Sequence, residues 1–194
     1  MSSFAEHAIL SPPGGTDAPS PPLVAALREL APGLRAAARE VEAARRIPAA
    51  HMERVRATGF FDLVKPAAYG GAEQSFAALV EANLLLAQHC ASTAWVCGLL
   101  AAHQWLLAGF PAEAQHDVWG ADPDALLCGS YAPASRAQPA PGGLRLSGSW
   151  SFASGCENAR WALCAAMVPC ADDPSRLEPA FLLVPATDYR IVDT

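Results

Sequence analysis

The hydrophobic pattern of this 194-residue chain changes period near residue 122, and that change restricts the fold class more than any single motif does. Before residue 122, apolar residues recur three and four positions apart, a spacing typical of helices that bury one face. The predicted helices cover 23–41, 48–59, 75–89, 92–109 and a short stretch from Pro111. After residue 122, short alternating or continuously apolar runs are divided by Gly, Pro and Asp, which predicts strands. Helices first and strands second indicate an α+β fold and not alternating βαβ units.

We therefore expect an all-α helical domain at 23–122, followed by a small antiparallel β-barrel or sheet domain at 123–194. The predicted strands lie in ALLCGSYAP, GLRLSGSWSFAS, RWALCAAMV, AFLLVPA and YRIVD. Residues 1–22 are rich in Pro, Gly and Ser without periodicity, so we expect a flexible N-terminal segment. The last predicted strand comes at the end of the chain with nothing visible to cover the sheet, and the β-domain is therefore predicted to be incomplete.

Composition and charge argue against several classes of protein. The net charge is −6 and the basic residues are not clustered, so we expect no nucleic-acid partner. The most apolar stretch, 91–110, contains His103 and Gln104, which favours a buried helix over a membrane span, and the first residues lack the pattern of a signal peptide. None of the six cysteines forms a CxxC pair, so we expect buried thiols in a reducing cytoplasm and no metal site. Dinucleotide, P-loop, serine-hydrolase and zincin motifs are absent.

The stretch SWSFASGCENARW, residues 149–161, raises the question of function. It alternates polar and apolar residues like a strand, yet Ser154 and Gly155 stand where a core would prefer a branched apolar residue. The residues alone leave two interpretations open: a tight turn, or a flat ligand with polar edges that lies against the backbone. His103 is equally open, because a histidine in an apolar helix is ordinarily a core residue with one nitrogen satisfied.

Three stretches carry a resemblance to a known family. RRIPAAHMERVRATGFFDLVKPAAYGG, residues 45–71, resembles the N-terminal signature of the acyl-CoA dehydrogenase superfamily, and GSWSFASG, residues 148–155, fills the frame of that superfamily's flavin-contacting Gly-x-Lys-x-Trp-Ile-Thr-Asn pattern. The residue types within that frame, together with CASTAWVCGLLAAHQW at 90–105, are similar to the flavin-dependent monooxygenase branch. The Thr-Glu-Pro stretch of the dehydrogenases is replaced by CGSYAPASRAQP, which separates the chain from them.

The resemblance implies roles for individual residues. Ser154 takes the place of the threonine that meets the flavin near N5, while Gly155 lets the backbone approach the ring. His103 would border the flavin or the substrate, where it orients the substrate hydroxyl or shuttles a proton. His103 and Ser154 are thus the expected catalytic residues. The expected flavin-binding residues are Ser130, Trp150, Phe152, Ser154 and Gly155. The expected substrate-pocket residues are Trp95, His103 and Ser130. The alternatives are a strand-edge serine bonded to a carbonyl and tryptophans packed in the core.

By the same resemblance, the chain is expected to be an oxidoreductase: the oxygenase component of a two-component aromatic hydroxylase. Reduced FMN, with FAD as the alternative, would come from a separate flavin reductase and react with O2 to hydroxylate a small aromatic molecule. The C-terminal helical bundle of the superfamily is lacking, which leaves three explanations open: a truncated product, one half of a split enzyme, or a fragment of a longer chain. A homo-oligomer or a second chain is expected to complete the fold. The alternatives are an acyl-CoA dehydrogenase or oxidase-like flavoprotein, and a non-catalytic truncated interaction module.

Overall fold

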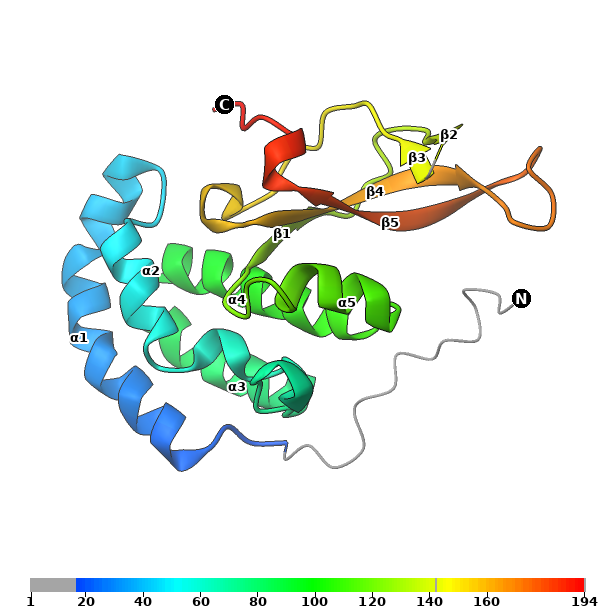
Figure 1. Cartoon of the computed structure of the whole chain (residues 1–194). Coiled ribbons are helices and arrows are strands. Elements are labelled where there is room, and N and C mark those ends of the chain that lie inside the picture. The colour runs from blue at the N-terminus through cyan, green and yellow to red at the C-terminus, as the bar shows by residue number, and fades with distance from the viewer. Residues whose placement is uncertain (1–16, 142, 194) are drawn as a thin grey trace. The chain divides into compact units, whose positions relative to one another are not determined.

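The computed structural model describes residues 17–141 and 143–193, and the chain divides into two compact units, Met1–Leu126 and Leu127–Thr194 (Figure 1). Among the described residues, the α-helices belong to the first unit and the strands to the second. This confirms the α+β fold class, while the domain bounds drawn from the sequence stay a prediction. Residues 1–16 of the predicted flexible segment lie outside the described residues, and Pro21 and Pro22 of that segment belong to the first helix.

All five predicted helices are present. Their bounds are α1 (Pro21–Ala44), α2 (Ala49–Arg56), α3 (Phe76–Ala87), α4 (Ala91–Ala108) and α5 (Ala112–Trp119). Prolines mark three of the starts, since Pro21 begins α1 while Pro48 and Pro111 directly precede α2 and α5. At α3 the hydroxyl of Ser75 accepts a hydrogen bond from the amide of Ala78 at 3.2 Å. This is an ordinary serine N-cap.

The core of the helical unit follows the predicted apolar spacing. Leu23, Leu27 and Leu30 form a buried stripe along α1. Phe60 and Phe61, in the 3-10 turn after α2, pack edge to face with ring centroids 5.7 Å apart. Complete burial of each such side chain is worth about 1.5–3 kcal/mol. Helices α1, α3 and α5 and this turn all contact α4, so α4 is the central helix of the unit.

The β unit is a mixed sheet with a separate hairpin. Strands β1 (Leu127–Ser130), β4 (Trp161–Pro169) and β5 (Leu177–Pro185) form one sheet in the order β1-β4-β5. β1 runs parallel to β4, and β5 runs antiparallel to it. β2 (Gln138–Ala140) and β3 (Gly143–Arg145) form a two-stranded antiparallel hairpin. The expectation of a wholly antiparallel domain is thus wrong for β1, and the strands of the described residues do not close into a barrel.

One predicted strand is wrong, and the strand predicted at 143–154 is right only for residues 143–145, which form β3. Residues 149–160 form a loop and a 3-10 turn, because Phe152 and Gly155 have φ of 61° and 79°, which an extended strand cannot contain. Residues 189–193 have no regular structure, since β5 ends at Pro185 and a 3-10 turn follows at Ala186–Asp188. Alternation of residue type alone does not report either change of backbone direction.

Candidate functional site

The loop at 149–155 is fastened to the sheet by its tryptophan. The indole Nε1 of Trp150 donates a hydrogen bond to the carbonyl of Ala165 on β4 at 2.8 Å. Before it, Gly148 leaves no room for a larger residue, because a Cβ there would lie 2.9 Å from the Trp150 ring. Trp150 is half-buried, so it serves as the anchor of the loop.

The tip of the loop presents an aromatic ring on a strained backbone. The side chain of Phe152 is 95% exposed, and its φ of 61° places a non-glycine residue in the left-handed region. That conformation costs roughly 1–2 kcal/mol for an L-residue. The carbonyl of Phe152 accepts a hydrogen bond from the amide of Ser154 at 2.8 Å, which tightens the turn. Exposed apolar bulk on strained backbone is a pattern that points to a functional role.

The residues after the tip supply polar groups and a close approach to the backbone. Ser154 is half-buried, and Gly155 follows it in the left-handed conformation that glycine adopts without penalty. Asn158 lies in the 3-10 turn Cys156–Asn158, and its Nδ2 is buried with no hydrogen-bond partner among the described residues. A buried donor without an acceptor costs about 1–3 kcal/mol, so this amide is suited to a ligand oxygen.

Uncharged thiol groups and the phenol of Tyr189 lie near this loop. Ser130 ends β1 and is half-buried, with Cys164 of β4 as its register partner. Burial, with the Cys156 thiol as a second cause, raises the pKa of Cys128 to about 12, and burial raises the pKa of Cys164 to about 11. Burial and the adjacent Cys128 also raise the pKa of the Tyr189 phenol. These groups therefore stay uncharged at neutral pH, and the surroundings of Ser130 are of low polarity.

Helix α4 carries the two remaining expected site residues. His103 is buried, at 1% exposure, whereas Trp95 is 65% exposed and is not the core residue that a large aromatic is by default. Gln104, next to His103, is also buried. The structure thus gathers Trp150, Phe152, Ser154 and Gly155 in one loop of the β unit, while Trp95 and His103 share one helix of the other unit.

Sequence reasoning missed Asn158 and Tyr189. Neither residue belongs to a motif, and only the three-dimensional structure shows the unpaired amide of one and the thiols beside the other. The available signal in the sequence was the position of Asn158, three residues after Gly155. The predicted burial of the thiols is confirmed for five cysteines, and Cys156 is half-buried.

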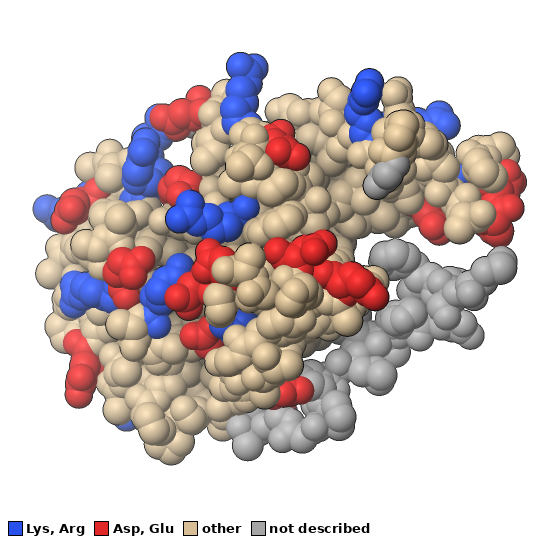
Figure 2. All heavy atoms as spheres, in the orientation of Figure 1, with Lys and Arg blue, Asp and Glu red and all other residues tan. Residues whose placement is uncertain are grey.

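The described residues offer neither a cluster of metal ligands nor a membrane-spanning helix. No group of three or more His, Cys, Asp or Glu side chains in that part of the chain is placed to hold a metal ion. None of its helices combines the length and apolar character needed to cross a membrane. On the face shown in Figure 2, blue and red side chains alternate over the surface, and the basic ones form no continuous stripe.

The arrangement defines a class of α+β protein in which a helical domain with an apolar central helix precedes a small mixed sheet with an exposed aromatic loop. Residues 24–121, about half of the chain, match the family described as acyl-CoA dehydrogenase, N-terminal domain. The chain belongs to this family.

Its relatives are named as flavin-dependent oxygenases. The chain is 59% identical over 172 residues to the oxygenase component of an FADH(2)-dependent resorcinol hydroxylase from Rhizobium sp. strain MTP-10005, covering 89% of this chain and 42% of the relative. It superposes on 3-HSA hydroxylase from Rhodococcus sp. RHA1 with a TM-score of 0.84 at 38% identity, covering 90% of this chain and 45% of that one. XiaF from Streptomyces sp., in complex with FADH2 and glycerol, gives a TM-score of 0.79 at 32% identity, covering 89% and 43%. The chain therefore spans less than half the length of these relatives.

Proposed function

We propose that this chain forms part of the oxygenase component of a two-component flavin-dependent monooxygenase that hydroxylates a small phenol. The observation that carries the proposal is the 59% identity to the oxygenase component of a resorcinol hydroxylase over 172 residues. The loop at 149–155 supports it independently, because its strained, exposed phenylalanine has no packing role of its own.

The residues of the β unit suit a flavin. Phe152 offers an exposed ring for a planar heterocycle, Gly155 offers backbone without a Cβ, and the unpaired Nδ2 of Asn158 offers a donor for a carbonyl or phosphate oxygen. Ser154 and Ser130 would supply hydroxyl groups at the ring edge, with Trp150 holding the loop in place. The bound reduced flavin would activate O2 for transfer of one oxygen atom to the substrate. FADH2 is the form named for two of the relatives, and reduced FMN is the alternative.

His103 and Trp95 are proposed to act on the substrate side. A buried imidazole can orient a phenolic hydroxyl by a hydrogen bond and accept its proton. The exposed indole of Trp95 offers an apolar wall that excludes water from the reacting groups.

The proposal extends to partners and compartment. The relative is named an oxygenase component, so a separate flavin reductase is the proposed source of reduced flavin. We further propose assembly with another copy or a second chain, which would cover the exposed aromatic rings of Trp95 and Phe152. Buried, unpaired thiols are typical of a reducing compartment and support a cytoplasmic location.

Turnover under isotopically labelled oxygen tests the proposal. The chain is supplied with a flavin reductase, NADH, FAD and resorcinol under ¹⁸O2, and the products are analysed by mass spectrometry. We expect a hydroxylated product that carries one ¹⁸O atom. Oxygen uptake that yields hydrogen peroxide alone, with resorcinol unchanged, would contradict the proposal.

A pair of serine variants tests the role of Ser154. Ser154→Ala removes a hydroxyl whose hydrogen bond is worth about 1 kcal/mol, so the yield of hydroxylated product relative to hydrogen peroxide should fall roughly fivefold. Ser151→Ala removes an exposed serine of the same loop and should leave that yield unchanged.

A further inference from the structure

Lys65, a residue of the signature at 45–71, is a buried cation that contacts both a nearby carboxylate and a distant backbone carbonyl. Its side chain is 5% exposed, and its Nζ pairs with the carboxylate of Asp62 and donates a hydrogen bond to the carbonyl of Pro123 at 3.0 Å. A buried ammonium is retained only where it is paired and hydrogen-bonded. Lys65 therefore joins the turn after α2 to a segment 58 residues further along the chain.

Arg56, from the same signature, contacts the next residue of that segment. Its Nη1 donates a hydrogen bond to the carbonyl of Asp124 at 2.9 Å and lies 4.0 Å from the Asp124 carboxylate. The guanidinium also lies over the ring of Phe61, 5.7 Å from its centroid. This stacking limits the rotamers of the arginine and aims it at the segment.

Gln104 makes the third contact of the same kind. Its Nε2 donates to the carbonyl of Ala125 at 3.2 Å, and its Oε1 accepts a hydrogen bond from Nε1 of Trp119 at 3.0 Å. Both side chains are buried. Three consecutive carbonyls, at 123, 124 and 125, are thus held by side chains from three different parts of the helical unit, and β1 starts two residues later at Leu127.

We propose that Arg56, Lys65 and Gln104 are positioning residues that hold the segment 123–125 within the helical unit and so order the residues that lead into β1, the strand that ends at Ser130. Donors to consecutive carbonyls oppose both translation and rotation of this segment, and charge-assisted hydrogen bonds are about twice as strong as neutral ones. Gln104 directly follows His103, so α4 carries both a proposed substrate-contacting residue and one of the three positioning residues. The consequence for flavin binding rests on the function proposed above.

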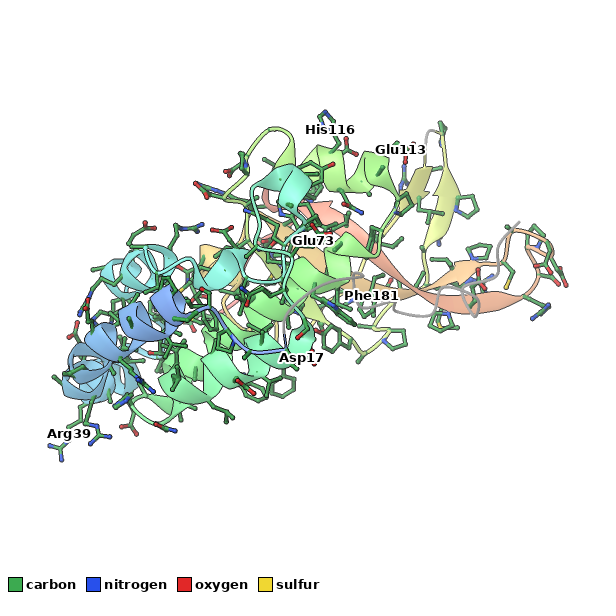
Figure 3. All side chains as sticks on the ribbon, turned by 90° about the horizontal axis from the view of Figure 1, so that it is seen from below. Asp17, Arg39, Glu73, Glu113, His116 and Phe181 are labelled. Carbon is green, nitrogen blue, oxygen red and sulfur yellow. The ribbon has the colours of Figure 1, made fainter. Side chains whose placement is uncertain are left out.

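Amide hydrogen exchange tests the fastening without any ligand. The reporters are the amides of Asp124 and Ala125, which donate to the carboxylate and the carbonyl of Asp122 at 3.1 Å and 3.0 Å. Arg56→Met should raise their exchange rates about tenfold, while Arg56→Lys, which keeps a charged donor, should restore most of the protection. Arg39→Met is the matched control, because Arg39 points away from the protein in Figure 3. Unchanged exchange at both amides in Arg56→Met would overturn the proposal.

Anaerobic titration with FADH2 separates this proposal from the proposed function. Arg56→Met should weaken FADH2 binding at least threefold at an unchanged urea midpoint, with Arg56→Lys close to wild type. Faster exchange with unaltered FADH2 affinity would overturn the positioning role. A wild-type chain that does not bind FADH2 would refute both the proposed function and the positioning role in flavin binding. The exchange rates would then test only whether the three side chains hold the segment 123–125 in place. Gln104→Leu provides a second variant, for which the same two amides should also exchange faster.

Discussion

Substitution of Phe152 tests whether its exposed ring serves flavin binding, because its backbone is strained and the ring makes almost no contact within the chain. Replacement by glycine removes the cost of the left-handed backbone conformation and so raises the free energy of unfolding by roughly 1–2 kcal/mol. Glycine also makes the unfolded chain more flexible, which lowers the free energy of unfolding by about 0.5–1 kcal/mol. The ring is 95% exposed, so its loss removes almost no buried area. The free energy of unfolding of Phe152→Gly should therefore equal that of wild type or exceed it by about 1 kcal/mol.

The same substitution should weaken flavin binding. A well-placed aromatic contact is worth about 0.5–1.5 kcal/mol, which corresponds to a two- to tenfold loss of affinity for reduced flavin. Urea unfolding followed by circular dichroism and anaerobic flavin titration measure the two effects. Phe152→Leu is the control, since it keeps the strained apolar residue and removes only the ring, and it should lose affinity without gaining stability. A Phe152→Gly variant that loses more than 1 kcal/mol of stability would contradict the backbone strain at this residue. A variant that binds flavin like wild type would contradict the contact between the ring and the flavin.

Two further predictions concern stability. Burial raises the pKa values of Cys97 and Cys128 from 9.0 to about 12, so between these pH values the folded chain keeps both thiols protonated while the unfolded chain ionises them. The stability that the two thiols contribute is therefore complete below pH 9 and is lost as the pH rises towards 12. Urea midpoints that stay constant from pH 9 to pH 12 would contradict this prediction. Gly71→Ala should lower the free energy of unfolding by at least 2 kcal/mol, because a Cβ there would lie 1.9 Å from the carbonyl oxygen of Lys65. Gly143→Ala is the control and should be nearly neutral, because no atom lies within 4 Å of a Cβ at that position. Thermal or urea unfolding measures both variants.

The helical unit was predictable because its signals are local. The buried leucine stripe of α1 and the prolines before α2 and α5 encode both the period and the starting points of helices. The parallel pairing of β1 with β4 was not predictable in this way. It depends on contacts between residues 34 positions apart, such as Leu127 with Trp161, and residue type carries little information about strand direction.

The candidate site was predictable only in part. The resemblance selected the loop at 149–155, yet the alternation of its residues predicted a strand, because period-two patterns carry no record of the positive φ at Phe152. The contacts of Arg56 and Lys65 were out of reach for a different reason. Their acceptors at 123 and 124 are backbone carbonyls, which every residue possesses and no sequence motif marks.

Anaerobic titration of the wild-type chain with FADH2, measured by equilibrium dialysis, tests directly whether this chain binds reduced flavin. We expect saturable binding of one flavin per chain, weaker binding of oxidised FAD, and loss of affinity in Phe152→Gly. Absence of saturable FADH2 binding at flavin concentrations far above those of the chain would contradict this expectation, because the loop would then have no flavin to hold.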